Sequence, residues 1–436
     1  MTFYLESLGC AKNQVDSELI IAALERAGLS WVADPQEAEL ILVNTCGFID
    51  SAKEESIRTA LELKDLYPQR KVVVAGCLVQ RYAAELGKEL TEVDGLIDCR
   101  RPEEIARSVR ALCGCGSRGP QDGVEGLFRE RRRFLSLPGS AYVKLAEGCS
   151  NRCSYCAIPL IKGGLQSRSR RSILAEVQSL LERGIEEINL VAQDLCSYGL
   201  DRGAPELMAL LEEFSTLKGD FWLRLLYLHP DRFPPRLPEL LAAEPRILPY
   251  FDLPFQHASA PVLARMNRRG SREAYLELVG GIRQSLPQAV IRSTLLVGFP
   301  GEGEEDFRTL QDFQNEAELD WLGVFTYSRE EGTPAFRYPG RVPRATALAR
   351  KRALEQVQAG ITQRRLERFV GRSLEVLVEE AVAGEGLYLG RAYIHAPEVD
   401  GAVVLQAGNL TPGRRVRARV ARRNGIDLEA VPDLGR

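Results

Sequence analysis

Three cysteines near the middle of the chain have the spacing of a metal site. The segment GCSNRCSYCAIP places Cys149, Cys153 and Cys156 with three and then two residues between them. A loop this short aims three thiolates at one point, whereas a structural zinc ion would require a fourth protein ligand. No fourth Cys or His lies close in sequence. Three thiolates therefore favour a 4Fe-4S cluster that leaves one iron open to a small molecule.

The histidines do not supply a competing set of ligands. His229, His257 and His395 are the only three in the chain, and they stand far apart in the sequence. Isolated polar side chains inside a protein are usually hydrogen-bonded parts of the fold. We therefore expect all three histidines to be structural.

A second set of cysteines stands at the ends of apolar runs in the first part of the chain. The runs FYLESLGC, LILVNTCGF and KVVVAGC end at or beside Cys10, Cys46 and Cys77. Successive cysteines are separated by the length of one strand-helix-strand unit, roughly 30 residues or more. In parallel sheets, ligands bind outside the carboxyl ends of the strands. We favour a shared metal site at this edge over the alternative, that each cysteine is a small buried hydrophobic residue.

Apolar strands alternate with helical segments around these cysteines. This pattern predicts an α/β N-terminal domain, residues 1–116, built on a doubly wound parallel sheet. A linker is expected over residues 117–134, in and after the Gly-rich run CGCGSRGPQDGVEG. Its charge run, Arg129–Arg133, is expected to be a solvated segment and not a binding patch. The linker region also holds three cysteines without partners of matching spacing, so that no metal site is expected there: Cys99, Cys113 and Cys115.

Residues 135–368 predict a partial (β/α)6 barrel, because six apolar strands alternate with helical segments. Eight strands would be needed for a complete barrel, and functional residues are expected on the loops that follow the strands. The six runs are AYVKLAE, INLVAQD, WLRLLYL, YFDLPF, VIRSTLLVGF and WLGVFTY. After a long helical segment, the short runs of residues 369–436 predict a small all-β barrel of five strands.

The composition sets the broad class of the protein. With 436 residues, 45% hydrophobic and 27% charged, and a formal net charge of -3, the chain is typical of a soluble globular protein without a global basic field. The N-terminus has no signal-peptide pattern, and no apolar run approaches the roughly 18 residues of a membrane span. The cysteines are therefore expected in a reducing compartment, the cytoplasm, where close spacing indicates metal or redox chemistry. We expect a monomer without membrane contact.

The central cysteine loop, with Tyr155 just before its last cysteine, resembles that of the radical S-adenosylmethionine (SAM) superfamily. The resemblance implies that the amino and carboxylate groups of SAM chelate the open iron, and that reductive cleavage yields a 5′-deoxyadenosyl radical. It also implies that Gly298 and Gly301, in VGFPGEGEEDF, let the backbone approach the adenine; the alternative is a strand-to-helix turn. Gln193 and Ser293 are the further expected contacts to SAM, or else structural residues. No residue is assigned as a catalytic acid or base.

The order of the three domains resembles that of the radical SAM methylthiotransferases, which insert sulfur into an unactivated C–H bond and methylate it. The resemblance covers nearly the whole chain. It implies that Cys10, Cys46 and Cys77 hold a second 4Fe-4S cluster and that the last module is a TRAM domain. It also implies a sulfide or persulfide donor and an electron donor such as flavodoxin or ferredoxin.

Finer motifs, among them LRLLYLHP and GRAYIHAPEVDG, are similar to one branch of that family. This branch methylthiolates the β-carbon of an aspartate in small-subunit ribosomal protein twelve; the alternative branch modifies a tRNA adenosine next to the anticodon. Two departures weaken the assignment of the substrate slightly. His395 stands where an acidic residue is usual, and Cys196 stands where threonine is common.

The charge of the last module bears on its partner. From Val370 onward there are nine Arg, no Lys, and nine Asp plus Glu, so the formal net charge is 9 - 9 = 0. A dedicated RNA-binding module usually carries a basic excess. Arg415, Arg417 and Arg419 alternate along one strand, and could line a basic face or simply be solvated. The acidic residues suited to a basic ribosomal protein are Glu379, Glu380 and Glu398.

Two other classes of protein fit the cysteines less well. A non-catalytic electron carrier would normally cover each cluster with four ligands. An RNA-binding protein without catalytic activity would not need six clustered cysteines. Formation of 5′-deoxyadenosine from SAM would separate an enzyme from both.

Overall fold

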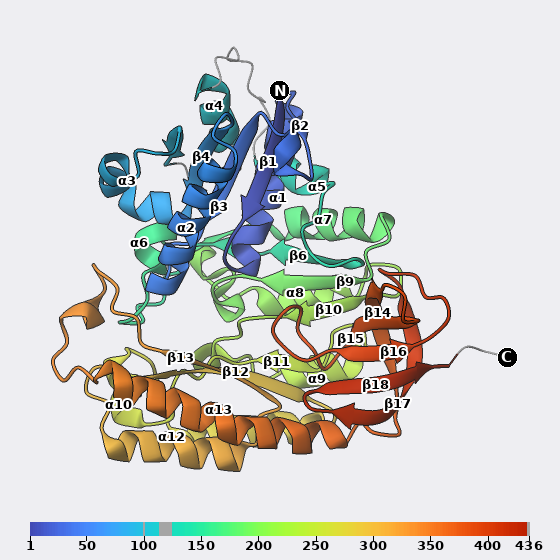
Figure 1. Cartoon of the computed structure of the whole chain (residues 1–436). Coiled ribbons are helices and arrows are strands. Elements are labelled where there is room, and N and C mark those ends of the chain that lie inside the picture. Colours follow the sequence, from blue (N-terminus) through green and yellow to red (C-terminus); the bar gives the residue numbers. More distant parts are fainter. Residues whose placement is uncertain (99–100, 113–123, 434–436) are drawn as a thin grey trace.

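The computed structural model of the chain describes residues 1–98, 101–112 and 124–433. Figure 1 shows three parts in chain order: a sheet domain, a central domain beneath it, and a small β barrel at one side. No helix within the described residues is long and apolar enough to cross a membrane. Three of the cysteines lie outside the described residues: Cys99, Cys113 and Cys115.

The N-terminal domain is a five-stranded parallel sheet of order β2-β1-β3-β4-β5. Alternate residues of β3 point to opposite faces, where Leu42 packs with α1 and α4 and Val43 packs with α2 and α3. The predicted doubly wound sheet is therefore confirmed. Its elements are β1 (Thr2–Ser7), α1 (Ala11–Arg26), β2 (Ser30–Trp31), β3 (Leu40–Thr45), α2 (Asp50–Leu66), β4 (Lys71–Gly76), α3 (Cys77–Glu89), β5 (Gly95–Ile97) and α4 (Pro102–Leu112).

The central domain has six parallel strands, as predicted, arranged as two three-stranded sheets of order β10-β9-β6 and β11-β12-β13. An isolated parallel bridge between Leu223 and Ile247 joins the two sheets. The strands are β6 (Ser140–Lys144), β9 (Glu187–Val191), β10 (Trp222–Leu225), β11 (Tyr250–Asp252), β12 (Val290–Val297) and β13 (Trp321–Thr326), with a small hairpin of β7 (Ala146–Glu147) and β8 (Gln166–Ser167).

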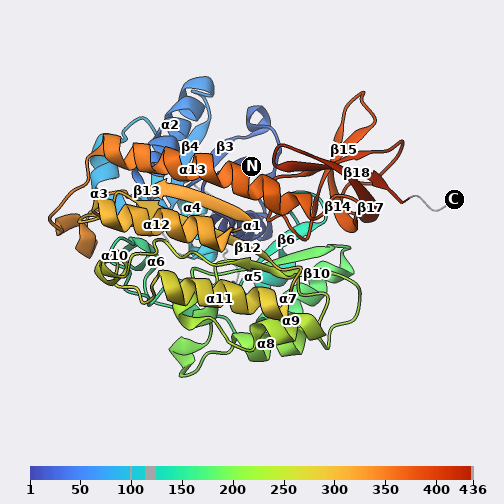
Figure 2. The ribbon, with the colours of Figure 1, turned by 90° about the horizontal axis from the view of Figure 1, so that it is seen from below.

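Helices cover the convex face of these strands. Figure 2 shows three of them, α11, α12 and α13, lying side by side. Phe251 of β11 packs in the core beneath the helices, whereas its neighbour Tyr250 packs in a second core shared with the other two domains. Asp252 faces the same concave side as Tyr250 because side chains alternate along a strand. The helices are α6 (Ile158–Lys162), α7 (Arg170–Glu182), α8 (Leu207–Phe214), α9 (Leu237–Ala243), α10 (Ala260–Arg265), α11 (Arg272–Ser285), α12 (Glu304–Ala317) and α13 (Arg344–Glu367).

The C-terminal module is a closed barrel of order β14-β15-β16-β18-β17, which confirms the predicted five-stranded barrel. It is docked on the central domain through buried polar contacts. Arg391 of β15 pairs with Glu187 of β9 at 2.6 Å, and the Trp321 indole N–H donates to the Ile394 carbonyl at 2.7 Å. The strands are β14 (Ser373–Val382), β15 (Leu387–Ala392), β16 (Val403–Gln406), β17 (Arg415–Asn424) and β18 (Asp427–Pro432).

The segment between the first two domains corrects one expectation. The predicted linker contains a helix, α5 (Val124–Glu130), and the arginine run after it is not wholly solvated. Arg131 is 0% exposed and its guanidinium donates to the carboxylates of Glu18 on α1 and Glu176 on α7. A buried charge is tolerated when it is paired, and here both partners come from segments distant in sequence. Arg131 therefore ties the N-terminal domain to the central one.

Candidate functional site

The central cysteine loop lies between β7 and α6, at the end of β6. Cys149 is buried, and Cys153 and Cys156 are half-buried. Backbone hydrogen bonds fix the loop: Cys149 N donates to Gly163 O at 3.1 Å, and Cys156 N to Cys153 O at 3.1 Å. Gly148 has a φ of +66°, and a Cβ there would lie 2.2 Å from the Gly164 carbonyl oxygen. Only glycine therefore fits immediately before Cys149.

The thiols of this loop influence one another. Burial raises the pKa of Cys149 to about 11 and that of Cys156 to about 12, and the neighbouring cysteines add to both increases. The backbone N–H of Asn151 also points at the Cys149 sulfur, 3.4 Å away. A coordinating cation displaces the thiol protons. Cys149 and Cys156 are therefore protonated thiols in the absence of a metal, and ligation of iron would require them to lose their protons.

Tyr155 contacts a buried cation that the sequence analysis missed. The Arg268 guanidinium donates to the Tyr155 hydroxyl at 3.4 Å and to the Pro254 carbonyl at 2.7 Å. Arg268 is 6% exposed and lies close enough to Cys153 to interact with its charge. Arg268 lies in the loop after α10, and no local sequence motif indicates that it lies beside the cysteine loop. A positive charge beside the thiolates would stabilise a reduced, more negative cluster.

The second cysteine set lies at the carboxyl edge of the N-terminal sheet. Cys10 precedes α1, Cys46 follows β3, and Cys77 is the first residue of α3. The first two flank the point where the strand order reverses between β1 and β3, which is where ligands bind in such sheets. Gly9 has a φ of +98°, and its added Cβ would lie only 3.2 Å from the Cys46 sulfur. The loops before α1 and after β3 are therefore in close contact.

These three thiols are also near neighbours electrostatically. Burial raises the pKa of Cys77 to about 12, with smaller increases from Cys46 and Cys10. Burial likewise raises the pKa of Cys46, and Cys10 adds to that increase. The structure thus brings together the three cysteines that the sequence placed at separate strand ends.

The two cysteine sets face each other across the domain interface. Cys77 packs in one buried apolar cluster with Ala157 and Ile161, which directly follow the central cysteine loop. In agreement, α3 contacts α6. The N-terminal domain therefore carries its cysteines to the open end of the barrel strands.

Buried ion pairs join the same two loops. Asp16 of α1 accepts from the ammonium groups of Lys144 on β6 and Lys162 on α6, the latter at 3.1 Å. Lys144 also pairs with Glu147 at 2.5 Å. The two lysines lower the pKa of Asp16 despite its burial, so it remains ionised. These side chains connect the segment after Cys10 with the segments on both sides of the central loop.

Among the residues that the structure describes, no group of three or more His, Cys, Asp or Glu side chains is arranged to hold a metal ion. A four-iron cluster places its thiolate ligands on separate irons, so its ligands need not converge on one point. One loop with three cysteines, and a second set of three cysteines on neighbouring segments of the sheet edge, fit such clusters better than single ions.

Two of the residues expected to contact SAM, Gln193 and Ser293, belong to the regions of β9 and β12 in the central domain. Gln193 follows β9 and is half-buried. Ser293 of β12 is fully buried, and its hydroxyl donates to the Leu253 carbonyl at 2.7 Å and accepts from the Phe255 N–H at 3.2 Å. That hydroxyl therefore holds the backbone after β11. A contact from Ser293 to SAM stays a prediction.

Gly298 and Gly301 form the strand-to-helix turn between β12 and α12. Gly298 has a φ of +77°, and a Cβ there would lie 2.5 Å from that of Ala347 on α13. Its N–H donates to the Glu302 carboxylate at 2.5 Å. Gly301 has a φ of +85°, and its N–H donates to the Gly340 carbonyl at 2.6 Å. The turn alone accounts for both glycines, and their approach to an adenine stays a prediction.

The three histidines are structural, as expected. Each ring accepts a backbone N–H through Nδ1: His229 from Asp231, His257 from Ser259, and His395 from Ala392. Burial lowers the pKa of His229 to about 2 and that of His257 to about 3. Burial and the charge of Arg391 likewise lower the pKa of His395. The imidazoles are therefore neutral parts of the fold.

Two expectations about the C-terminal surface are wrong. Glu379 does not face a partner, because it is 8% exposed and pairs with Arg391 at 2.6 Å. Arg415 does not belong to a free basic face, because it pairs with Glu186 of the central domain at 2.8 Å. Both residues serve contacts within the chain. The exposed members of the two sets are Arg417, Arg419, Glu380 and Glu398.

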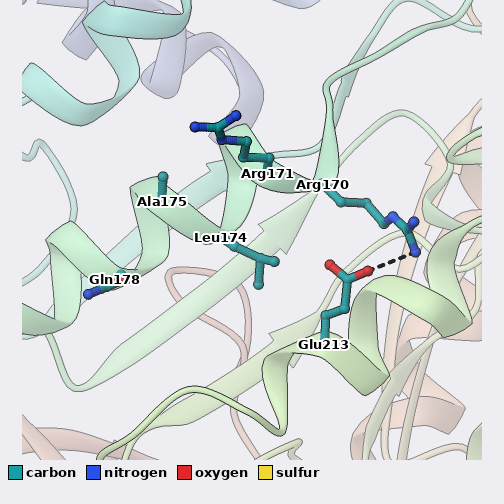
Figure 3. A pocket seen from close by; sticks show the side chains of 6 residues that line it. All are labelled: Arg170, Arg171, Leu174, Ala175, Gln178 and Glu213. Atoms are coloured by element: carbon teal, nitrogen blue, oxygen red, sulfur yellow. Dashed lines mark ion pairs between the residues drawn. The ribbon is translucent and has the colours of Figure 1, made fainter.

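A hollow of about 590 Å³ lies on the helical side of the central domain. Figure 3 shows the six side chains that line it. Arg170 spans it to pair with Glu213 at 2.8 Å. None of the six cysteines lines it. It is a feature of the helix layer and not part of the cysteine site.

Three family models match the chain. They are "Uncharacterized protein family UPF0004" over residues 2–98, "Radical SAM superfamily" over residues 143–313, and "TRAM domain" over residues 370–432. The second contains the central cysteine loop, and the first contains the other cysteine set.

Curated relatives match along nearly their whole length. "Ribosomal protein uS12 methylthiotransferase RimO" of Treponema denticola is 44% identical, over 97% of this chain and 99% of its own. The protein of the same name from Pelotomaculum thermopropionicum is 45% identical, over 97% of each chain.

Solved structures share the fold at low sequence identity. The radical SAM methyltransferase TsrM of Kitasatospora setae, with cobalamin and a [4Fe-4S] cluster bound, has a TM-score of 0.56 at 16% identity and covers 77% of this chain and 76% of its own. The cobalamin-dependent SAM radical enzyme OxsB has a TM-score of 0.51 at 10% identity, with 81% and 56% covered.

Proposed function

The chain belongs to the ribosomal protein uS12 methylthiotransferases, a family of radical SAM enzymes, and from this premise we propose that it methylthiolates an aspartate of uS12 at the β-carbon. The product would carry S–CH3 in place of one β-hydrogen. The observation that carries the proposal is the contact, across one domain interface, between Cys77 of the N-terminal set and the segment that follows the central cysteine loop.

Each cysteine set is proposed to hold one 4Fe-4S cluster. Cys149, Cys153 and Cys156 would ligate the cluster that binds SAM, and the other set would ligate a cluster for the sulfur to be transferred. When bound, the clusters and SAM supply the one-electron chemistry and the methyl group. The ligands of the cluster for the transferred sulfur would be Cys10, Cys46 and Cys77.

The side chains of the protein itself position these groups and exclude water. The Arg268 charge lies beside the central loop, and His229 and His257 are neutral. Tyr155, Gln193 and the backbone at Gly298 and Gly301 are the proposed contacts to SAM. Ser293 would support them by holding the segment after β11.

The proposed chemistry consumes a sulfur atom and an electron, and partner molecules must supply both. Insertion of sulfur consumes a sulfur atom, so we propose a sulfide or persulfide donor. Reductive cleavage of SAM consumes an electron, so we propose an electron donor such as flavodoxin or ferredoxin. A monomeric enzyme in the cytoplasm, where uS12 is made, fits these needs.

The decisive experiment offers both candidate substrates to the reconstituted protein in one reaction. Purified uS12 and unmodified tRNA are incubated with SAM, a reductant and sulfide, and both are analysed by mass spectrometry. We expect one methylthio group on an aspartate of uS12 and none on tRNA. Modified tRNA adenosine with unmodified uS12 would assign the chain to the other branch of the family.

A further inference from the structure

Lys12 is a buried cation between the two cysteine-bearing domains. It lies in the first turn of α1, two residues after Cys10, and is 9% exposed. Its ammonium nitrogen lies 3.5 Å from the centroid of the Tyr227 ring. Tyr227 follows β10 at the open end of the barrel and has a φ of +66°. The N-terminal domain thus places a positive charge at the entrance of the central domain.

Three other buried cations near this interface have acidic partners, and Lys12 does not. Lys144 and Lys162 share Asp16, and Arg292 pairs with Asp252 at 3.4 Å. In the described part of the chain, no carboxylate lies within 4.0 Å of the Lys12 ammonium. An aromatic face attracts a cation but carries no net charge to balance it.

Asp252 is the carboxylate that interacts with Lys12 over a longer distance, and it is already engaged. One oxygen accepts from the Tyr227 backbone N–H at 2.9 Å, and the other faces the Arg292 guanidinium. Both oxygens are therefore already engaged, and neither lies within 4.0 Å of the ammonium. A buried ammonium without a paired anion is costly, so an anionic ligand at this place would be stabilised.

We propose that Lys12 binds the side-chain carboxylate of the substrate aspartate. The inference rests on the proposed function, which places a carboxylate one bond away from the reacting carbon. A cation that holds the carboxylate also holds the β-carbon in place, because the β-carbon is bonded directly to the carboxyl carbon. Lys12 reaches from the domain of one cysteine set to an aromatic ring of the other domain, so a β-carbon held there lies between the two sets.

A rival account is that Lys12 balances the negative charge of the cluster held by Cys10 and its partners, or of sulfide bound to it. Both accounts use anion binding, but they differ in which component loses affinity when the charge is removed. The ring of Tyr227 favours the substrate, because it places the ammonium against the central domain, where the substrate must enter.

The test is a double-mutant cycle in binding, without turnover. Affinities are measured by calorimetry for wild-type protein and K12Q, each with both clusters reconstituted and without SAM, against uS12 and a uS12 variant with asparagine at the modified position. We expect K12Q to weaken binding of uS12 by about 10- to 100-fold, the range for hydrogen bonds to charged groups. Binding of the asparagine variant should change little.

Two controls make the result specific. K12R keeps the charge and should retain most of the preference for aspartate over asparagine. Lys88→Gln removes an exposed lysine near the end of α3 and should leave both affinities unchanged. Thermal unfolding of K12Q, compared with that of wild type, shows whether the variant is folded.

Several outcomes would overturn the inference. Equal weakening of both uS12 forms would mean that Lys12 has only a structural role. Unchanged uS12 affinity with a shifted midpoint potential, or with weaker binding of added sulfide by the N-terminal cluster, would assign Lys12 to the cluster. Failure of the wild-type protein to bind uS12 would instead remove the proposed substrate, and the inference with it.

Discussion

At the scale of single residues, the site depends on side chains that do no chemistry themselves. Gly148 and Gly9 adopt left-handed backbone and leave no room for a Cβ beside the cysteine loops. Arg268 and Lys12 add one positive charge to each side of the interface. The cysteines therefore lie in loops whose shape and charge are set by their neighbours.

The two cysteine sets should have separable roles. Replacement of Cys149, Cys153 and Cys156 by alanine should remove about half the iron and abolish the cleavage of SAM, because the SAM-binding cluster is lost. Replacement of Cys10, Cys46 and Cys77 by alanine should also remove about half the iron. This variant should still form 5′-deoxyadenosine but should make no methylthiolated product. Iron content, 5′-deoxyadenosine and product mass are measured in the same reactions.

Each triple variant is the control for the other. If the variant without Cys149, Cys153 and Cys156 still cleaved SAM, the radical site would lie elsewhere. If the variant without Cys10, Cys46 and Cys77, with its cluster shown to be absent, still made product at the wild-type rate, the role of the N-terminal domain would be wrong.

At the scale of elements, α1 links the two sites. It begins just after Cys10, carries Lys12 over the Tyr227 ring, and places Asp16 between Lys144 and Lys162. Those lysines flank the central cysteine loop along the chain. One helix therefore sets the position of one cysteine loop relative to the other.

Asp16→Asn tests that link. The substitution leaves the ammonium groups of Lys144 and Lys162 less fully paired, and breaking such a buried pair costs about 3 to 5 kcal/mol. We expect full iron content and SAM cleavage but at least a tenfold loss of methylthiolated product. Pulsed electron paramagnetic resonance should show a changed or broader distance between the reduced clusters.

The matched control for Asp16→Asn is Asp65→Asn, on the exposed part of α2, which should behave as wild type. An Asp16→Asn protein with wild-type product and an unchanged cluster distance would show that the ion pairs do not position the loops.

The elements were largely predictable from the sequence, and the contacts between them were not. Apolar runs of four or more residues predicted the strands that carry the cysteines, but β2 and β5, with two and three residues, are too short to form a pattern. The roles of Arg131 and Lys12 depend on Glu18, Glu176 and Tyr227, which only the folded chain brings near. Local composition made Arg131 look solvated, because the burial of a charge is decided by distant partners.

At the scale of the whole molecule, the central domain and the C-terminal module share one buried polar core. Glu187 of β9 lies between Arg224 of β10 and Arg391 of β15, at 2.9 and 2.6 Å. Tyr250 and Asp400 hydrogen bond at 2.5 Å, again between the central domain and the C-terminal module. The module is therefore an integral part of the central domain's base and not a mobile appendage.

Glu187→Gln should destabilise the whole chain. Burial alone would raise the pKa of Glu187, but Arg391 and Arg224 lower it to about 2. The stabilisation is thus present above the ordinary pKa near 4.5 and is lost as the pH falls from there toward 2. The variant leaves two arginines without their shared acid, so we expect a loss of about 3 to 5 kcal/mol at pH 7.

Urea unfolding from pH 7 down to pH 3 measures this difference. Wild-type and Glu187→Gln stabilities should approach each other as the pH falls below 4.5, because protonation of Glu187 in the unfolded chain reduces the stability of wild type alone. Glu305→Gln, whose side chain is 90% exposed, should follow wild type throughout. A constant gap between wild type and Glu187→Gln at all pH values would exclude Glu187 ionisation as the source.

The contact between Glu187 and Arg391 also affects when the central domain can finish folding during synthesis. The two residues are 204 positions apart, so Arg391 is synthesised long after Glu187. Until Arg391 has been synthesised, the C-terminal module cannot cover the concave face of the central domain. Glu187 then has only Arg224 as a partner. The central domain is therefore completed only after β15 has been synthesised, and a nascent chain stalled before β15 should bind chaperones rather than assemble a working site.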